Sequence, residues 1–587
     1  SGFACGFARK LDSSDADEVL ASRVSQIPYR IQPETGALCD YSLSKVATGQ
    51  MWYATSRAWY TPGVDDGGKI YTSTFGSEGW AWYDGGEVLL LEKYHPDAME
   101  WSLMKSVSRY AAGETYREKV LRFGGAGLWK LGDPEGAAWL SPGQSFTFGT
   151  TRYEFIDGSW QDAFYSFRDS MDQKGHSLPA NYNPPVHWNE LYDNPLWTIG
   201  DSVANRDIYY KLSDMKVEAE KAYEIGCECL YLDPGWDTNF GSNLWGTYMS
   251  NGVTYRLGPQ KDFIDAMAVG HDHELALALH TPLAAWSLPW SFPASCKRPD
   301  GGLCGSSTTY AAEKAARLIA TCNGYETNEG AYFVMFDGNW FVGGCTDPTH
   351  GHAIPNTRQD HNNMIQSICQ QLHAVHPNVV IEVHDPVIGP GCSRYCPTYI
   401  IQGDDGFDEL WGYEFMNYTL AEVDSRKAMT LYYVNMAYQI PIYLHINLKT
   451  DNEKAFGFWW FASTCKHLGF GGVHSNPIAW QAHKDAMQTY LSLKPFFTQG
   501  VFYGIEEAFH AHTLTDQNAA VIVCFNLLDS LDPLAFQFDL SEIGLDEGLQ
   551  YQITGADTAQ RTGNTVSITV QTPTHGVKII QIAPVAN

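Results

Sequence analysis

The sequence has few basic residues and lacks long apolar runs. Its 587 residues include 38 lysines and arginines against 67 aspartates and glutamates, which gives a formal net charge of -29 and a pI near 4.9. We expect no nucleic-acid partner, because phosphate binding needs a basic face. No apolar run approaches the roughly 18 residues of a transmembrane helix, so we expect no membrane partner either.

The 13 cysteines are scattered, without a C-x-x-C pair and without the His/Cys spacing typical of zinc sites. There is no H-E-x-x-H motif, and the H-x-H pairs fall in predicted loops: His271/His273, His350/His352 and His510/His512. We therefore predict no metal and no cofactor. Two cysteine groups are candidates for disulfides, with free buried thiols as the alternative: Cys296 with Cys304, and Cys392 and Cys396 with Cys345.

The sequence also lacks internal repeats and low-complexity tracts. Its pattern of apolar residues and turn residues divides it into three parts. Residues 1–180 contain short aromatic and β-branched runs between Gly, Asp and Pro turns, such as 79–83, 87–92 and 145–151, which predict an N-terminal β-sandwich. An amphipathic helix is expected over 160–171. Residues 496–587 return to β patterning and predict a small C-terminal antiparallel β-domain.

Strands and helices alternate between residues 181 and 495, as in parallel βα units. The pattern predicts strands at 186–190, 229–232, 275–280, 332–337, 379–383, 398–402, 442–446 and 469–474. It predicts helices at 209–225, 261–269, 309–321, 358–374, 426–437, 453–468 and 479–492. Eight such units favour an α/β fold with a catalytic (β/α)₈ TIM barrel between the two β-domains.

Polar side chains gather where these strands end. The set comprises Trp188, Asn189 and Glu190, then Asp233 and Trp236, His280, Asp337 and Trp340, Glu382, His384 and Asp385, Asp404, Asp405, Asp408 and Glu409, His445 and Asn447, and His474 and Asn476. One strand-end carboxylate is usually a helix cap. Eight strands that all end in such residues favour a binding cleft at the C-terminal face of a barrel.

Glycoside hydrolases commonly use a pair of carboxyl groups as catalysts. One carboxylate attacks the sugar, and the other carboxyl group protonates the leaving oxygen. Crowded acids in a partly dry cleft acquire the two different pKa values that this chemistry needs. Trp188, Trp236 and Trp340 would offer apolar surfaces to sugar faces, and the histidines would bind hydroxyl groups. The alternatives are a non-catalytic carbohydrate-binding barrel and a metal-dependent hydrolase whose cation is held by His280, His384, His445, Asp233 and Asp337.

Three of these segments resemble the clan of retaining α-galactosidases that includes glycoside hydrolase families 27 and 36. The L-D-D-G-W motif of strand 2 corresponds to 232–236, the K-x-D motif of strand 4 to 335–337, and the start of strand 1 to 185–189. The resemblance implies that Asp337 is the nucleophile and that Asp233 binds a substrate hydroxyl. It points to Asp404 or Asp405 as the acid/base, whereas the divergent family 129 favours Glu382; we rank Glu382 first, Asp405 second and Glu409 third.

Two departures from the clan motifs remove polar contacts to sugar hydroxyls. Pro234 replaces the second carboxylate of strand 2, and Met335 replaces the lysine beside the nucleophile. Such a site should favour a sugar with fewer free hydroxyls, because buried hydroxyl contacts carry much of sugar discrimination. Family 129 includes α-N-acetylgalactosaminidases and enzymes that release 3,6-anhydro-galactose, so the resemblance implies a retaining exo-acting α-glycosidase that acts on carrageenan-type oligosaccharides.

Galactose and N-acetylgalactosamine stay open as the terminal sugar, and a transglycosylase of the same clan is the alternative reaction. The expected partner is an oligosaccharide. The sequence leaves open whether the chain forms a homo-oligomer, and it leaves the compartment open, with a periplasmic or secreted location slightly favoured.

Overall fold

The computed structural model describes most of the central and C-terminal chain and selected segments of the N-terminal part. The described residues are 4–11, 23–27, 40–42, 74–77, 79–84, 86–94, 100–110, 117–128, 142–143, 145, 147, 149–177, 182–190, 212–232, 236, 241–243, 246–250, 253–257, 274–327, 330–338, 341–383, 398–399, 419–424, 429–437, 443–528 and 530–585.

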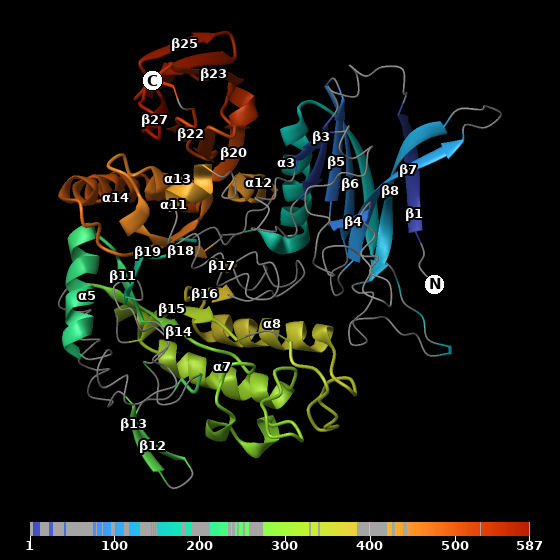
Figure 1. Ribbon diagram of the computed structural model, residues 1–587, viewed down its shortest axis with the longest axis vertical. Helices are drawn as coiled ribbons and strands as arrows, with labels where there is room; N and C mark the ends of the chain where they lie inside the picture. The colour runs from blue at the N-terminus through green and yellow to red at the C-terminus, as the bar shows by residue number, and fades with distance from the viewer. Residues whose placement is uncertain are drawn as a thin grey trace.

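Two antiparallel sheets occupy the N-terminal part (Figure 1). One has the order β1-β8-β7-β4, with β1 (Ala4–Leu11), β8 (Arg117–Leu128), β7 (Glu100–Tyr110) and β4 (Thr74–Ser77). The other has the order β3-β2-β5-β6-β9, with β3 (Asp40–Ser42), β2 (Arg23–Ile27), β5 (Gly79–Asp84), β6 (Glu87–Tyr94) and β9 (Thr150–Asp157). The sequence pattern did not predict β7 or β8, and it began β9 too early, at residue 145.

Helix α3 (Trp160–Met171) matches its predicted bounds and joins the N-terminal sheets to the rest of the molecule. Its start is fixed by a capping box, in which the Asp162 carboxylate accepts a hydrogen bond from the Ser159 backbone at 2.6 Å. Figure 1 shows the helix beside β6 on one side and α12 (Met429–Ala437) on the other. Arg168 donates across this junction to the carbonyl of Phe502 at 2.6 Å.

The central element is a sheet of eight parallel strands in the order β17-β16-β15-β14-β11-β10-β19-β18. Their bounds are β10 (His187–Asn189), β11 (Cys229–Leu232), β14 (Ala276–His280), β15 (Ala331–Phe336), β16 (Val380–Val383), β17 (Thr398–Tyr399), β18 (Tyr443–Asn447) and β19 (His467–Gly471). All eight predicted strands are present. Among the described residues no pairing joins β17 to β18, so the structure shows a curled parallel sheet, and full closure into a barrel stays a prediction.

Helices cover the outer side of this sheet, as Figure 1 shows for the neighbouring pair α7 and α8. Their bounds are α5 (Leu212–Ile225), α7 (Thr308–Cys322), α8 (Arg358–Val375), α11 (Thr419–Asp424), α13 (Phe456–Thr464) and α14 (Pro477–Thr498). Short helices lie at Asp172–His176, Pro289–Ser291, Ala294–Cys296, Tyr325–Thr327, Leu448–Thr450 and Leu540–Ile543. None of the helices that the structure describes combines the length and apolar character needed to traverse a bilayer.

The sequence pattern missed a hairpin and misplaced both ends of helix α13. An antiparallel pair, β12 (Gly246–Ser250) and β13 (Val253–Leu257), was not predicted, and the helix expected over 261–269 lies outside the described residues. Helix α13 begins later than predicted because the Asp451 carboxylate caps its start, accepting from the Gly457 and Phe458 amides at 2.8 and 3.0 Å. The helix also ends earlier, at Thr464, and strand β19 begins at 467, two residues before its predicted start.

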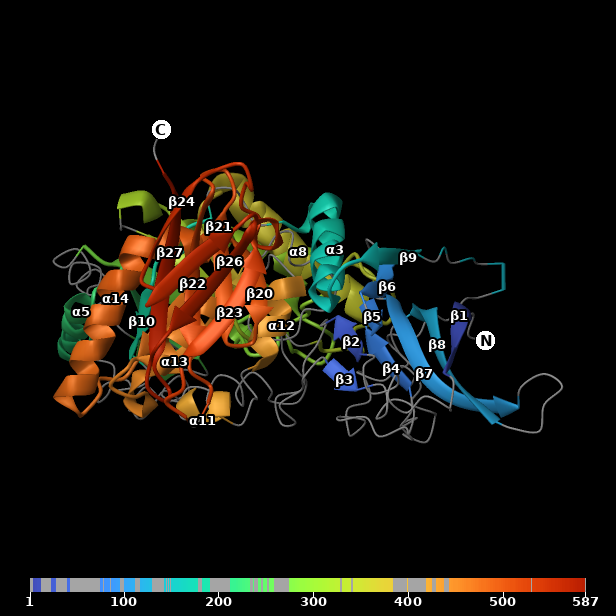
Figure 2. The same ribbon diagram turned by 90° about the horizontal axis from the view of Figure 1, so that it is seen from above.

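The C-terminal part consists of two antiparallel sheets, which Figure 2 shows lying over α13 and α14. The larger sheet contains β20 (Val501–Glu506), β21 (Phe509–Leu514), β22 (Ala519–Phe525), β27 (Val577–Pro584) and β24 (Tyr551–Thr554). The smaller contains β23 (Leu534–Asp539), β26 (Thr565–Val570) and β25 (Thr558–Thr562). A core between them includes the rings of Phe509 and Phe536, stacked at 4.0 Å.

Two histidines of this region correct a sequence-based expectation. His510 and His512 were predicted in a loop, but both are buried on β21, where each ring forms a hydrogen bond of 2.9 Å with the Ser463 hydroxyl of α13.

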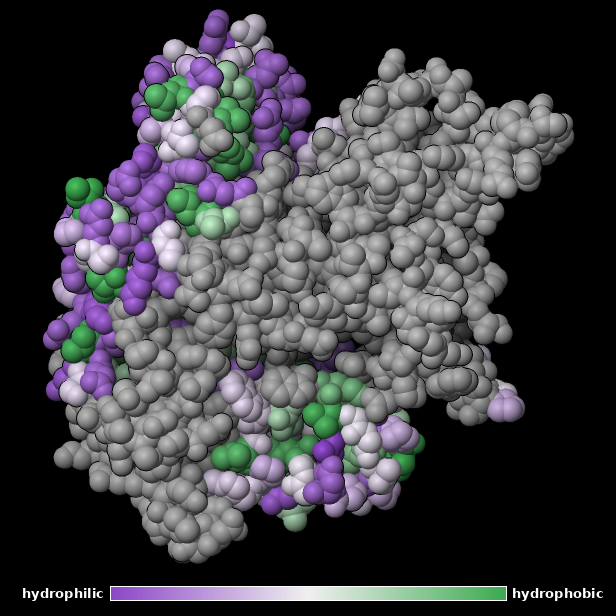
Figure 3. All heavy atoms as spheres, in the orientation of Figure 1, coloured by the Kyte–Doolittle hydropathy of each residue, from purple (hydrophilic) through white to green (hydrophobic). Residues whose placement is uncertain are grey.

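On the outer face seen in Figure 3, hydrophilic residues border scattered hydrophobic ones over the C-terminal sheets. The domain boundaries 1–180, 181–495 and 496–587 stay a prediction.

Candidate active site

Alternate residues of the parallel strands face the interior of the curled sheet. Seven buried side chains form a hydrophobic cluster there: Cys229, Tyr231, Ala276, Ala278, Phe333, Met335 and Val380. Because side chains alternate between the two faces of a strand, the next inward positions are His280 on β14, Asp337 after β15 and Glu382 on β16. The strands therefore carry one imidazole and two carboxylates on the same face.

Asp337 and His280 form a hydrogen-bonded pair at the C-terminal ends of neighbouring strands. The His280 Nε2 atom lies 2.8 Å from Oδ2 of Asp337, and because a carboxylate only accepts, Nε2 is the donor. The Gly338 amide donates to the other carboxylate oxygen. Asp337 is 7% exposed and His280 is 2% exposed. Two donors thus hold a nearly buried carboxylate in one orientation, with a small part of it open at the rim.

The loop that follows β14 packs along the end of β15 and fixes this pair. The Thr281 and Leu283 amides donate to the carbonyls of Met335 and Asp337 at 2.7 and 2.6 Å, so the backbone pairing continues past both strand ends. Gly338 has a φ of +58°, and a Cβ at this position would lie 2.3 Å from the Cβ of Trp286. Only glycine fits this approach without strain.

Two tryptophans contact His280, one at its imidazole and one at its backbone carbonyl. Trp286 presents its ring edge-on to the imidazole, with centroids 5.5 Å apart, and Trp236 donates from Nε1 to the His280 carbonyl at 2.6 Å. Trp236 was among the predicted site residues, whereas Trp286, which follows the strand end by several residues, was not. The turn residues before Trp286 gave no strand-end signal, so only the packing of the loop against Gly338 reveals it.

Glu382 lies deeper in the sheet than Asp337. Its Cα partner on β15 is Met335, two residues before Asp337. A strand rises about 3.3 Å per residue, which places Glu382 about 7 Å farther from the rim. Its side chain is fully buried. The Cα of His280 also pairs with Met335, so the backbones of His280 and Glu382 lie at the same register, and the His280 side chain reaches Asp337.

Trp188 does not occupy the position expected for a sugar platform. Its neighbour His187 faces the interior, where its ring contacts Tyr231 and Phe333, so Trp188 must face the helices. There its Nε1 donates to Glu218 of α5 at 2.8 Å, and its ring packs edge-on against Trp480 of α14. The prediction that Trp188 binds sugar is therefore wrong, because strand alternation turns it away from the interior.

The His187 imidazole lies in a closely packed part of the sheet interior, where burial favours its neutral form. Burial lowers the pKa of His187 well below its usual value, and neighbouring His467 lowers that pKa further. A Cβ on Gly469 would lie 1.8 Å from His187 Nε2, so β19 must carry glycine where this imidazole sits. Asn189, one of the predicted ligands, is buried on the same face as His187.

The other predicted residues are placed only in part. His474 follows β19 and contacts the Asp451 carbonyl at 3.2 Å. His445 lies on β18 opposite Gly469, and the structure describes its backbone alone. Eight predicted residues lie outside the described residues: Asp233, Trp340, His384, Asp385, Asp404, Asp405, Asp408 and Glu409.

No protein-family model matches the sequence, and no curated protein matches it. Solved structures do resemble the fold. A variant of the GH36 α-galactosidase AgaA from Geobacillus stearothermophilus, in complex with stachyose, has a TM-score of 0.53 at 13% identity and covers 90% of this chain and 75% of its own. The chain has the fold of a glycoside hydrolase.

Other structures agree with this likeness. A variant of a glycoside hydrolase family 97 enzyme from Pseudoalteromonas sp. strain K8 has a TM-score of 0.51 at 11% identity, covering 99% of this chain and 84% of its own. The α-galactosidase from Lactobacillus brevis has a TM-score of 0.50 at 13% identity, covering 86% and 69%. At such identities the likeness concerns the fold.

Proposed function

We propose that the protein is a retaining exo-acting α-glycosidase that releases a terminal galactose-type sugar, with Asp337 as the nucleophile. The observation that carries this proposal is the Asp337–His280 pair on the inner face of two neighbouring parallel strands, in a fold shared with GH36 α-galactosidases. Barrel enzymes place their chemistry at this end of the strands. Complexes of the relatives with stachyose and raffinose support an oligosaccharide substrate.

In the first step, Oδ1 or Oδ2 of Asp337 attacks the anomeric carbon, and the bond to the leaving oxygen breaks as that oxygen takes a proton from the acid. His280 keeps the attacking carboxylate aligned through its hydrogen bond. In the second step, water donates its proton to the same residue, now a base, and displaces Asp337 from the sugar. The anomeric configuration is retained because the carbon is inverted twice.

The order of the acid/base candidates changes because Glu382 is fully buried, whereas Asp337 is partly exposed. We propose that Asp405 or Glu409, which follow β17 in the sequence, supplies the proton, and that Glu382 does not. Comparing Glu382→Gln, Asp405→Asn and Glu409→Gln tests this. The variant of the true acid should keep turnover of a nitrophenyl glycoside, whose leaving group needs no proton, and azide should rescue its activity. If only Glu382→Gln shows this behaviour, the new order is wrong.

For the substrate we propose 3,6-anhydro-D-galactose at the end of a carrageenan-type oligosaccharide. Met335, at the position of the clan's sugar-binding lysine, is 2% exposed and packs among the apolar residues of the interior. An anhydro bridge removes two hydroxyls, which suits a site with fewer polar ligands. The test compares release of anhydro-galactose from odd-numbered carrageenan oligosaccharides with hydrolysis of nitrophenyl α-galactoside and its N-acetylgalactosamine analogue. Faster turnover of either simple glycoside contradicts this choice.

A further inference from the structure

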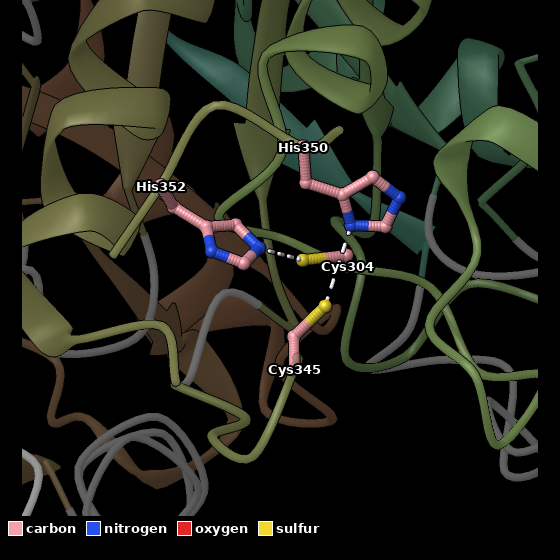
Figure 4. A group of neighbouring side chains, drawn as sticks. All are labelled: Cys304, Cys345, His350 and His352. Carbon is pink, nitrogen blue, oxygen red and sulfur yellow. Dashed lines mark hydrogen bonds between the residues drawn. The ribbon is translucent and has the colours of Figure 1, made fainter. Parts of the chain in front are cut away.

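We propose that Cys304, Cys345, His350 and His352 bind a structural zinc ion. Figure 4 shows the two sulfur atoms and one nitrogen of each imidazole directed toward a common point. One ligand atom from each residue lies within 4.8 Å of all the others. Three of the four side chains are buried, and His352 is half-buried. Two thiolates with two imidazoles are a ligand set that zinc prefers.

Two sulfur–nitrogen distances in the cluster are close to those of a tetrahedral ion. Cys304 Sγ lies 3.3 Å from His352 Nε2, and Cys345 Sγ lies 3.3 Å from His350 Nδ1. A zinc ion with bonds of about 2.3 Å to sulfur and about 2.0 Å to nitrogen separates sulfur from nitrogen by about 3.5 Å. Each pair therefore needs to open by only a few tenths of an ångström to admit the ion. Binding would displace the two thiol protons into solvent.

The second nitrogen of the His352 imidazole is placed as a zinc ligand requires. Nδ1 of His352 donates to the Ala353 carbonyl at 2.6 Å, so Nε2 presents its lone pair to the cluster. Nε2 of His350 lies 3.7 Å from Oδ2 of Asp347, which leaves Nδ1 directed at the cluster. Outer partners of this kind fix the ring tautomer and orientation of metal-bound histidines.

The backbone around the cluster is also held in place. Asn356 closes the turn that carries Cys345, accepting from the Cys345 amide at 2.8 Å and donating from its own amide to the Cys345 carbonyl at 3.2 Å. The Thr308 amide donates to the His350 carbonyl at 3.0 Å. Gly351, between the two histidines, has a φ of +76°, and a Cβ there would lie 2.9 Å from Thr308. The ligands thus project from a preorganised turn.

The ion would connect the two loops that shape the candidate active site. Cys304 belongs to the loop between β14 and α7, and the other three ligands belong to the loop between β15 and α8. The same loops follow His280 and contain Asp337. Four protein ligands leave no open position for a substrate, so the ion is structural. The proposal departs from the expectation of no metal. Cys296 and Cys304 are both free thiols, which was the alternative to a disulfide between them.

Metal analysis of the purified full chain by inductively coupled plasma mass spectrometry tests the proposal. We expect about one zinc per chain in the wild type and nearly none in Cys345→Ala and His352→Ala. Cys369→Ala, which removes a buried thiol outside the cluster, and His373→Ala are the matched controls and should retain the ion. Loss of zinc from the controls as well, or its absence from the wild type, overturns the proposal.

A second measurement on the wild type does not depend on whether the variants fold. Exchange of the ion for Co²⁺ should produce the visible absorption of a tetrahedral site and the near-ultraviolet band of thiolate–cobalt charge transfer. Thiol titration of the unreduced, denatured protein should recover both Cys304 and Cys345. An octahedral cobalt spectrum, or a disulfide between these two cysteines, contradicts a Cys₂His₂ site. Neither readout depends on glycosidase activity, so this proposal and the proposed function can fail separately.

Discussion

Replacing Asp337 by asparagine should separate the chemistry from the stability of the fold. The amide keeps the shape of the carboxylate and an oxygen that accepts from the Gly338 amide. Its nitrogen would face Nε2 of His280, which can switch tautomer and accept. One altered hydrogen bond costs about 1 kcal/mol of unfolding free energy. A neutral amide cannot form the glycosyl ester, so kcat should fall at least about 10⁴-fold, or about 5.4 kcal/mol of transition-state stabilisation.

The assay measures kcat and KM on a nitrophenyl glycoside and on the oligosaccharide, together with urea unfolding of each variant. Asp300→Asn, which changes a carboxylate that is 61% exposed in a neighbouring loop, is the control and should leave both quantities unchanged. The smaller variant Asp337→Gly adds a positive test, because azide can enter the vacated space and form a β-glycosyl azide. If Asp337→Asn keeps more than about one per cent of wild-type kcat, Asp337 is not the nucleophile.

Three further predictions rest on single contacts. Gly338→Ala should lower the unfolding free energy by about 1–3 kcal/mol and should reduce kcat by displacing Asp337. The control is Gly563→Ala, which has a φ of +64° and nothing within 4 Å of its Cβ, so that it measures the backbone strain alone. Equal effects of the two substitutions on unfolding free energy would refute the clash with Trp286. Lys314→Met should lower the free energy of unfolding in urea by about 3 kcal/mol, because the buried Lys314 ammonium donates to the Gly241 and Pro282 carbonyls at 2.9 and 2.7 Å. The control Lys216→Met changes an exposed lysine and should lower it little. Burial lowers the pKa of His510 from 6.5 to about 3, so between these pH values the unfolded state binds a proton that the folded state does not, and stability should fall as pH falls through this window. In His510→Gln the slope of unfolding free energy against pH should be shallower by up to about 1.4 kcal/mol per pH unit. An unchanged slope contradicts a buried neutral imidazole at this position.

The local signals in the sequence were sufficient for the parallel sheet. Continuous apolar runs such as 229–232 and 332–336 have no amphipathic period, so they predict strands covered on both faces, and the structure places β11 and β15 there. The start of α13 could not be predicted, because it depends on the Asp451 carboxylate, which accepts from the first amides of the helix only in the folded chain. The β pattern that begins at residue 145 starts before strand β9, because a β pattern in the sequence does not reveal whether a partner strand is present at each residue.

The amino-acid sequence by itself determined the strand–helix order and the identity of the strand-end residues, because both follow from local periodicity and from the way runs end. The tertiary structure alone decided which of these residues meet. It turned Trp188 outward, set Glu382 below Asp337, and brought Cys304 beside a turn from a different loop. Strand register and loop packing are long-range properties of the folded chain, and the spacing of residues along the sequence does not contain them.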